Sequence, residues 1–347
     1  MRVVVTGVSG RLGQRLLAEL DAADEVDAIV GLDVAEPARG ARKLEFHRCD
    51  ITTADLKPLL EGATVVVHLA AVVGPVTDVG AARRVNVDAT RRLLDAASAV
   101  SARRFVRASS AAVYGAWANN PVPITEDTPL RPNPEFAPAL HDAECERLML
   151  EWSDAHPEAS TVSLRLAPVV GPGIESLFAA VAAGRSPVRV RGVERPVQVV
   201  HVDDAASALA LAAIGDLDGV YNVAANGWLS AAEAEAVAPS TKRPALPEEL
   251  AERTLRTMWN SGLGDAPPAV LPYLVHPWVV ANDRLRAAGW EPRHGNEEAI
   301  VLSGDPDHAR SSLPWIAAVG AVLTGAAGAT WWLSRRGGRG SKWSSRR

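Results

Sequence analysis

The sequence predicts a doubly wound α/β fold, in which helices cover both faces of a parallel sheet. Short runs of β-branched and other apolar residues alternate with longer segments whose apolar residues recur at helical spacing. The short runs are continuously apolar, which is typical of parallel strands buried on both faces. A glycine-rich turn joins the first run to the first helical segment, as expected at the start of a βαβ unit.

The elements follow one another in a regular order. We expect strands at Arg2–Val5, Ala28–Leu32, Thr64–Leu69, Arg104–Ala108, Val162–Leu166 and Gly219–Val223. We expect helices at Arg11–Leu20, Ala81–Ser98 and Ala143–Ala155, the last overlapping the helical stretch Phe136–Trp152. Glycine and proline become frequent from about Gly171, with helical patterns remaining at Ile174–Ala183 and Pro247–Met258. This change predicts a smaller C-terminal lobe, mainly over residues 171–300.

Composition and charge exclude several classes of protein. The 347 residues are 48% hydrophobic and 22% charged, which is ordinary for a globular protein. A net charge of −5 gives no electrostatic case for nucleic-acid binding. Cys49 and Cys145 match no metal-ligand spacing, so we expect two free thiols and no metal site. The first residues read as a strand and a turn, and we expect no secretory signal.

The turn TGVSGRLG, from Thr6 to Gly13, predicts a dinucleotide site and a Rossmann-type sheet. Gly7 allows a tight turn, Gly10 allows the backbone to approach a pyrophosphate, and Gly13 allows the helix to pack on the strand. The start of the following helix then presents free N–H groups to the phosphates. The other residues expected to contribute from this turn are Ser9, Arg11 and Leu12.

Asp33 closes the second expected strand, twenty residues after Gly13. A carboxylate at this place accepts hydrogen bonds from the adenosine ribose hydroxyls and repels a 2′-phosphate. The sequence therefore favours NAD over NADP, although Arg39 nearby could soften the preference. Asp50 and Ile51 follow a third strand, which precedes the one at Thr64–Leu69, and are expected at the adenine edge.

Together, the motifs resemble those of extended short-chain dehydrogenases/reductases, in the NAD-dependent epimerase/dehydratase group that acts on nucleotide sugars. The resemblance covers about Arg2 to Pro292. Besides TGVSGRLG, it rests on the motifs CDI (49–51), HLAA (68–71), NV (86–87), SSAAVYG (109–115), LRLAPVVGPG (164–173), VHVDDAA (200–206) and YNVA (221–224). It implies a nucleotide-sugar-like substrate, bound by the C-terminal lobe.

The resemblance also assigns expected roles to individual residues. Leu69, Ala70 and Ala71 would line the cofactor after the fourth strand. Asn86 would brace the sheet and helix beside the site, and Ser110 would bond the reacting oxygen of the substrate. Pro168 would pass near the nicotinamide, and the VHVDD segment would face the substrate lobe.

The catalytic pair of this family is missing. Its members carry Tyr-x-x-x-Lys on the helix after SSxxVYG, where the ammonium lowers the pKa of the phenol and the phenol transfers a proton. With Glu146 as the anchor, Pro138 occupies the tyrosine position and Asp142 the lysine position. With Glu144 as the anchor, Phe136 and Leu140 stand there instead.

No other segment supplies the pair. None of the three tyrosines has a lysine four residues later, and no lysine occurs between residues 58 and 241. His141 or Cys145 could act as a replacement acid, and Asp142 or Glu144 as a base. Two hypotheses therefore stay open: an epimerase, dehydratase or reductase that uses Ser110 and another acid, or a membrane-tethered NAD-binding sensor or scaffold without turnover.

A charge-free segment stands near the end of the chain. Residues 313–333 are 21 residues, about 31 Å as a helix at about 1.5 Å per residue, which matches the hydrocarbon core of a bilayer. Trp315 stands at one end of the segment and Trp331 and Trp332 at the other, as in an aromatic belt. We therefore expect an NAD-binding domain at residues 1–302, a linker at 303–312, a transmembrane helix at 313–333 and a basic tail at 334–347.

The orientation of this segment stays open. A cytoplasmic domain would require the basic tail to cross the membrane, against the tendency of basic residues to remain inside. Alternatively, the helix lies in the interface and the tail binds anionic lipids. Both arrangements place the domain in the cytoplasm, anchored by its C-terminus. Small residues recur every four positions from Ala317 to Ala329, so pairing of two such helices, and hence a homo-oligomer, is a further hypothesis.

Overall fold

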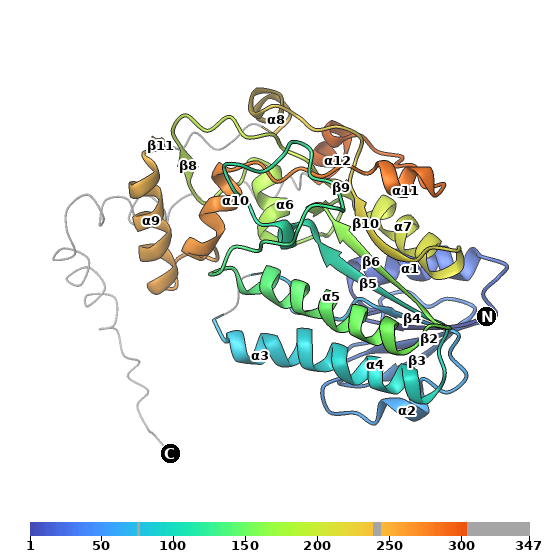
Figure 1. Ribbon diagram of the computed structural model, residues 1–347. Helices are drawn as coiled ribbons and strands as arrows, with labels where there is room; N and C mark the ends of the chain where they lie inside the picture. Colours follow the sequence, from blue (N-terminus) through green and yellow to red (C-terminus); the bar gives the residue numbers. More distant parts are fainter. Residues whose placement is uncertain (75–76, 239–243, 304–347) are drawn as a thin grey trace, which may run out of the picture. The chain divides into compact units, whose positions relative to one another are not determined.

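A computed structural model of the protein describes residues 1–74, 77–238 and 244–303. A seven-stranded parallel sheet has the order β10-β6-β5-β4-β1-β2-β3 (Figure 1). Its strands are β1 (Arg2–Thr6), β2 (Ala28–Asp33), β3 (Leu44–Arg48), β4 (Val65–His68), β5 (Arg104–Ser110), β6 (Ser160–Leu166) and β10 (Gly219–Val223). This order and direction confirm the predicted Rossmann-type parallel sheet, and every strand expected from the sequence is present.

Helices cover both faces of the sheet (Figure 1). On one face, α1 (Arg11–Ala22) and α7 (Val202–Ile214) contact each other. On the other face lie α3 (Val79–Arg83), η1 (Arg84–Asp88), α4 (Ala89–Ala99) and α5 (Ala137–Ala155), with α2 (Leu56–Leu59) beside α4. Two separate cores result, one with Val3, Val5 and Leu16, the other with Val4 and Leu93. Alternate residues of β1 thus enter different cores, which explains its continuously apolar sequence.

Shorter elements complete the compact unit that contains the seven-stranded sheet. They are η2 (Ala111–Tyr114), β7 (Val169–Val170), α6 (Leu177–Ala182), β9 (Val200–His201), α8 (Ala231–Val237), η3 (Pro268–Val270), α10 (Leu271–Val275), α11 (Asp283–Ala287) and α12 (Asn296–Leu302). A second compact unit contains β8 (Arg189–Val190), which pairs with β11 (Ala245–Leu246), and α9 (Glu248–Asn260).

The helix expected at Ala81–Ser98 is interrupted by one π turn. Residues 84–88 form this turn between α3 and α4. In this turn, the backbone carbonyl of Asn86 accepts a hydrogen bond from the Thr90 hydroxyl at 2.6 Å. Such a turn has no apolar periodicity of its own, so the sequence pattern predicts one uninterrupted helix.

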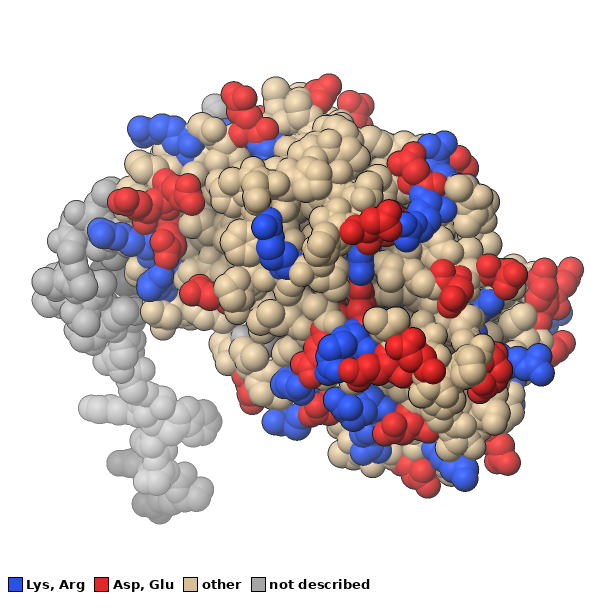
Figure 2. Space-filling view, viewed as in Figure 1, with Lys and Arg blue, Asp and Glu red and all other residues tan. Residues whose placement is uncertain are grey.

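Charged side chains are interspersed over the outer helices α3 to α5 (Figure 2). Arg83 pairs with Glu144 at 2.5 Å, and Arg147 pairs with Glu151 one turn along α5. Both pairs are open to solvent, the first of them only in part, and solvent-screened pairs contribute little to stability.

The predicted C-terminal membrane segment is not part of this picture. Among the residues that the structure describes, no helix is both long enough and apolar enough to cross a bilayer. The predicted helix at 313–333, the basic tail and nearly all of the linker lie outside the described residues.

Candidate functional site

The glycine-rich turn between β1 and α1 has no room for side chains. Gly7 has a φ of 73°, and a Cβ there would lie 2.7 Å from the backbone nitrogen of Ala70. At Gly13 a Cβ would lie 2.2 Å from the carbonyl oxygen of Gly7, and at Gly10 the same distance would be 3.3 Å. The first N–H groups of α1 have no partner within the helix, and its first turn carries no acid. The turn therefore fits a pyrophosphate.

Asp33, at the end of β2, is attached to this turn. Its carboxylate accepts hydrogen bonds from the backbone N–H groups of Ser9 at 3.0 Å and Val34 at 2.7 Å. The Ser9 hydroxyl donates to the carbonyl oxygen of Ala35. A carboxylate has more acceptor positions than these bonds use. Asp33 is thus held beside the turn and can still accept bonds from ribose hydroxyls, which fits the predicted preference for NAD.

The loop after β4 closes over the same turn. The backbone nitrogen of Leu69 bonds the Thr6 carbonyl at 3.1 Å, and that of Ala70 bonds the Thr6 hydroxyl at 3.3 Å. The Asn86 amide accepts from the nitrogen of Val72 at 2.7 Å and donates to its carbonyl at 3.1 Å. Asn86 therefore braces this loop, which also carries Ala71.

Three other residues expected at the cofactor lie near this edge of the sheet. The guanidinium of Arg11 contacts Gly173, where a Cβ would lie 2.8 Å from its Nε atom. Leu12 is partly buried against the core below the turn. Pro168 follows β6, and its carbonyl accepts a hydrogen bond from Val200.

Asp50 and Ile51 contribute less directly. The Asp50 carboxylate accepts hydrogen bonds from the backbone and hydroxyl of Thr52 at 2.9 and 2.7 Å. These bonds lower the pKa of Asp50 and turn one of its oxygens toward its own loop. Ile51 is buried in the core under α4. Their predicted contact with adenine stays a prediction.

An ion pair occupies the expected lysine position on α5. Arg107 of β5, which is fully buried, donates from Nη2 to the Asp142 carboxylate at 2.6 Å. Burial raises the pKa of Asp142, and the guanidinium opposes that shift. Burial alone would lower the pKa of Arg107, but Asp142 raises it above its ordinary value. Pro138, in the tyrosine position, stands in the first turn of α5, where a helix tolerates proline.

The register anchored on Glu144 does not supply an acid and its partner either. Phe136 is buried, with its ring 4.8 Å from that of Tyr273 and 5.8 Å from that of Phe178. Leu140 is exposed. In neither register does the tyrosine position carry a group that can transfer a proton.

A second buried ion pair fixes the anchor of the helix. Glu146 pairs with Arg165 of β6 at 2.6 Å and accepts a hydrogen bond from the Ser109 hydroxyl, also at 2.6 Å. Arg165 also donates to the hydroxyl of Tyr114 at 2.7 Å, and that hydroxyl donates to Asn222 at 2.8 Å. Burial raises the pKa of Tyr114 to about 12, against the opposing effect of Arg165. Tyr114 is therefore a poor acid at neutral pH.

The remaining candidate acids are also occupied by structural contacts. The Tyr273 hydroxyl donates to the Ala112 carbonyl at 3.0 Å, and burial raises its pKa. Ser110 accepts a hydrogen bond from the backbone of Ala112 at 3.1 Å and so caps η2. Cys145 donates to the Asn86 carbonyl at 3.2 Å, and burial raises the pKa of its thiol.

His141 differs from these groups. It is buried, and its Nδ1 atom has no hydrogen-bond partner among the described residues. Burial lowers its pKa, so it is neutral at physiological pH. Arg107 Nη1 is likewise buried without a partner in the described part of the chain. Buried polar atoms without partners are uncommon and mark places where a ligand or water completes the bonding.

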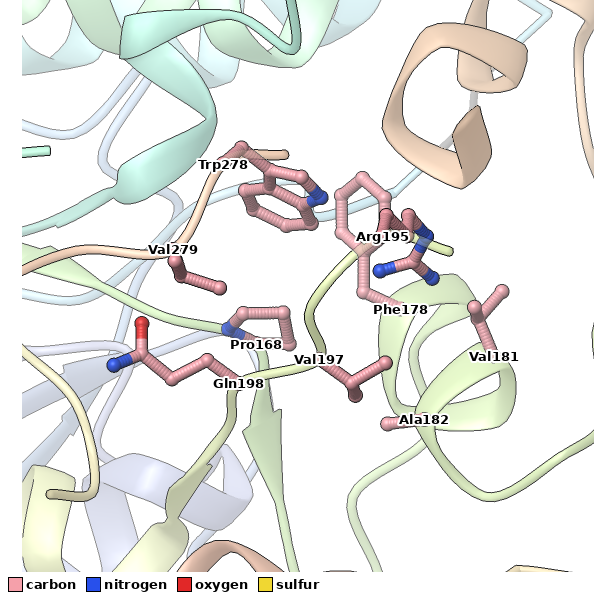
Figure 3. Close-up of a pocket in the computed structure, with 9 residues that line it drawn as sticks. All are labelled: Pro168, Phe178, Val181, Ala182, Arg195, Val197, Gln198, Trp278 and Val279. Carbon is pink, nitrogen blue, oxygen red and sulfur yellow. The ribbon is translucent and has the colours of Figure 1, made fainter. Parts of the chain in front are cut away.

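A pocket lies beside Pro168, and its empty space of about 360 Å³ is partly open to solvent (Figure 3). Phe178, Val197 and Trp278 give it a mainly apolar lining, and Arg195 adds a cation. Sequence reasoning missed this pocket and the Arg107 and Arg165 pairs. A signal existed for the pairs, because an arginine inside an otherwise apolar strand requires a buried partner.

Comparisons with known proteins place these features in a family. The model of the NAD dependent epimerase/dehydratase family matches residues 3–224. A 3-diazoavenalumate denitrifying reductase of Streptomyces sp is 30% identical over 322 residues, covering 85% of this chain and 97% of the relative. An uncharacterized protein of Mycobacterium tuberculosis strain H37Rv is 29% identical over 241 residues, covering 67% of this chain. That match spans only 64% of the mycobacterial protein.

Solved structures have the same fold. The UDP-glucose 4-epimerase of Thermus thermophilus, in complex with NAD, is 26% identical with a TM-score of 0.67. MoeE5, in complex with UDP-glucuronic acid and NAD, is 24% identical with a TM-score of 0.68. Each match covers 87% of this chain and 97% of the other. NAD, the cofactor predicted from the sequence, is also the one in the family's description. The chain belongs to the NAD dependent epimerase/dehydratase family.

Proposed function

We propose that this protein binds NAD(H) at the turn between β1 and α1 and does not perform the proton transfer by which its family epimerises or dehydrates sugars. The observation that carries the proposal is the ion pair between Arg107 and Asp142, which stands where the lysine is expected. The cofactor cradle is intact, and only the groups that serve chemistry differ. The protein then acts as a sensor or scaffold that responds to NAD.

The residues of the cradle have distinct tasks. Gly7, Gly10 and Gly13 let the backbone approach the pyrophosphate, and the first turn of α1 supplies N–H donors. Asp33 accepts bonds from the ribose hydroxyls of adenosine and disfavours a 2′-phosphate. Asn86 keeps the loop after β4 in position. When bound, NAD supplies the capacity to accept or donate a hydride.

Sugar oxidation needs more than this cradle. A hydroxyl that loses a hydride must also lose a proton, so a base has to stand beside it. The phenols of Tyr114 and Tyr273 are buried and hydrogen-bonded, with raised pKa values. Asp142 is engaged by Arg107, and no lysine occurs between residues 58 and 241. These features support binding of the cofactor without epimerisation.

Calorimetric titration of the purified full chain with NAD and NADP tests the first part of the proposal. We expect NAD to bind at least tenfold more tightly, about 1.4 kcal/mol, and Asp33→Asn to reduce this preference. Failure to bind either cofactor would contradict the proposal. The second part is tested by following the epimer ratio of UDP-glucose and UDP-glucuronic acid in the presence of NAD. Turnover of either sugar would show that the protein is an enzyme of the usual kind.

A reductase is the second candidate, and the pocket beside Pro168 favours it. Its lining is mainly apolar, which suits a substrate with few hydroxyl groups. Hydride donation to an electrophile does not require removal of a hydroxyl proton, and water can supply the proton that completes a reduction. The reductase of Streptomyces sp, matched over 97% of its length, gives this candidate a further argument. Substrate-dependent loss of NADH absorbance would establish it.

A nucleotide-sugar-like ligand is the class that the family suggests. MoeE5 has been solved with UDP-glucuronic acid and with UDP-glucose, each together with NAD. UDP sugars are therefore included in the titrations as ligands, separately from their use as substrates. Light scattering of the same samples tests the proposed homo-oligomer.

We further propose that residues 313–333 anchor the protein to a membrane with the NAD-binding domain on the cytoplasmic side. The support is the charge-free length of the segment, its flanking tryptophans and the basic tail after it. Fractionation of cells that express the full chain, or a chain ending at residue 303, tests the anchor. Recovery of the full chain in the soluble fraction would remove it.

A further inference from the structure

The pocket beside Pro168 contains one charged group in apolar surroundings. Phe178, Val197 and Trp278 face a common space in Figure 3, and the guanidinium of Arg195 stands at its side. The empty space between these side chains is about 360 Å³, and part of it is open to solvent.

Gln198, the other polar residue of the lining, is fully used by the fold. Its amide nitrogen donates to the carbonyls of Ala225, Gly227 and Val280, and its oxygen accepts from the backbone of Val280 at 2.8 Å. It therefore ties strands and loops together and has little capacity left for a ligand. Arg195 is the polar lining residue that retains donors.

Arg195 has no acidic partner among the described residues. Its Nε donates to the Leu274 carbonyl at 2.9 Å and its Nη1 to the Pro196 carbonyl at 3.3 Å. These two bonds fix the plane of the guanidinium and leave other N–H groups unused. Burial lowers the pKa of Arg195 to about 10, so it is still charged at neutral pH. The charge of Arg195 therefore has no counter-ion in the described part of the chain, and an anionic ligand would supply one.

The aromatic part of the pocket is rigid. The rings of Phe178 and Trp278 lie 4.9 Å apart between centroids, and Tyr273 packs against both at 5.5 and 5.2 Å. The Trp278 indole nitrogen donates to the Tyr273 carbonyl at 3.1 Å. These contacts hold two flat apolar surfaces in place, which favours a flat apolar ligand.

We propose that this pocket binds a planar, carboxylate-bearing aromatic compound, with the carboxylate on Arg195 and the ring against Phe178 and Trp278. A guanidinium recognises a carboxylate with parallel hydrogen bonds, and the apolar lining desolvates the ring. A sugar would leave its hydroxyl groups without partners here, at a loss in affinity. That the pocket lies beside the nicotinamide rests on the proposed function, because only the expected role of Pro168 places it there. The recognition of a carboxylate by Arg195 does not depend on the proposed function.

The test compares an acid with its neutral amide. Cinnamate and cinnamamide have the same ring and nearly the same shape, so their affinities differ through the charge. Calorimetry with the full chain in mild detergent should show at least tenfold tighter binding of cinnamate. Arg195→Met should weaken cinnamate at least tenfold and remove the preference over the amide. The exposed Arg191 supplies the matched control, because Arg191→Met removes the same charge outside the pocket lining.

Equal affinity for acid and amide, or unchanged binding of cinnamate by Arg195→Met, would overturn the proposal. Thermal melting identifies variants that fail to fold. If Arg195→Met does not fold, the acid–amide comparison on the unaltered chain and the binding of both compounds by Trp278→Leu test the proposal instead. Trp278→Leu should weaken both compounds, because both use the ring. The NAD titration separates the two proposals. Cinnamate binding that depends on Arg195 without NAD binding refutes the proposed function alone, and the reverse refutes the pocket alone.

Discussion

The turn after β1 and the start of α5 lie at the same end of one parallel sheet, yet they depart from the family to very different degrees. The turn works through the absence of side chains at Gly7 and Gly13, where even a Cβ would collide with backbone. The start of α5 works through the presence of two particular side chains, and neither is there. On the proposed function, cofactor binding and proton transfer are therefore separable, because the backbone cradle does not depend on the side chains that the start of α5 lacks.

Buried polar groups connect the two regions. The Thr6 hydroxyl, just before the turn, bonds Nδ1 of His68 at 2.7 Å, and Nε2 of His68 bonds Thr90 at 3.0 Å. Arg107 is the neighbour of His68 on β5.

The largest effect is expected from Arg107→Met. It leaves the Asp142 carboxylate buried without its partner, and breaking a buried ion pair in this way costs about 3–5 kcal/mol of stability. The double variant Arg107→Met/Asp142→Leu should regain most of this loss, because no charge is then left unpaired. Denaturant unfolding measures both.

The matched control is Arg147→Met, on the same helix but in an exposed pair with Glu151. It should change stability by about 0.5 kcal/mol or less. If Arg107→Met were equally harmless, the pair would not be a structural replacement for the lysine, and the contrast with the turn would lose its main argument.

Gly13→Ala tests the turn itself. The added Cβ would meet the Gly7 carbonyl oxygen at 2.2 Å, so the turn has to move away from the position that a pyrophosphate requires. We expect NAD binding to weaken at least 100-fold, about 2.7 kcal/mol. Gly40→Ala, where a Cβ meets nothing within 4 Å, is the control and should bind NAD as before. Retained binding by Gly13→Ala would place the cofactor elsewhere.

Whether a feature can be predicted from the sequence depends on how far apart along the chain its residues lie. The glycine turn and the six strands expected from the sequence are local patterns, which short windows of sequence can predict, whereas the two-residue strands carry too little pattern to be predicted. The pair of Arg107 and Asp142 joins residues 35 positions apart on different elements, so the sequence shows an aspartate in the lysine position without its partner. The pocket of Arg195 is assembled from four separated segments, and no periodicity announces it.

His68, which is hydrogen-bonded to Thr6 before the turn and pairs with Arg107 across the sheet, should make the free energy of unfolding depend on pH. Burial, with a contribution from Arg107, lowers the pKa of His68 to about 3 from 6.5. Below pH 6.5 the unfolded chain therefore binds a proton that the folded chain does not. The stability contributed by neutral His68 is complete above pH 6.5 and is lost as the pH falls toward 3. One unit below 6.5, the loss is about 1.4 kcal/mol.

Denaturant unfolding between pH 7 and pH 4.5 measures this effect in the parent chain and in His68→Gln. The variant keeps a hydrogen-bonding side chain but does not titrate, so its stability should fall less steeply over this range. Parallel pH profiles would mean that His68 is not held neutral between Thr6 and Thr90.

The smallest effect is expected at Ser110, the residue that the resemblance assigns to the reacting oxygen of the substrate. Its hydroxyl accepts a hydrogen bond from Ala112 and caps η2, so Ser110→Ala should cost about 0.5–1 kcal/mol and leave NAD affinity unchanged. Ser109→Ala is the sharper comparison. Ser109 donates to the buried carboxylate of Glu146, and a bond to a charged group contributes about 1.5–3 kcal/mol. If Ser110→Ala instead abolished a turnover shown by the parent chain while melting normally, the serine would be catalytic, and the separation of binding from chemistry would fail.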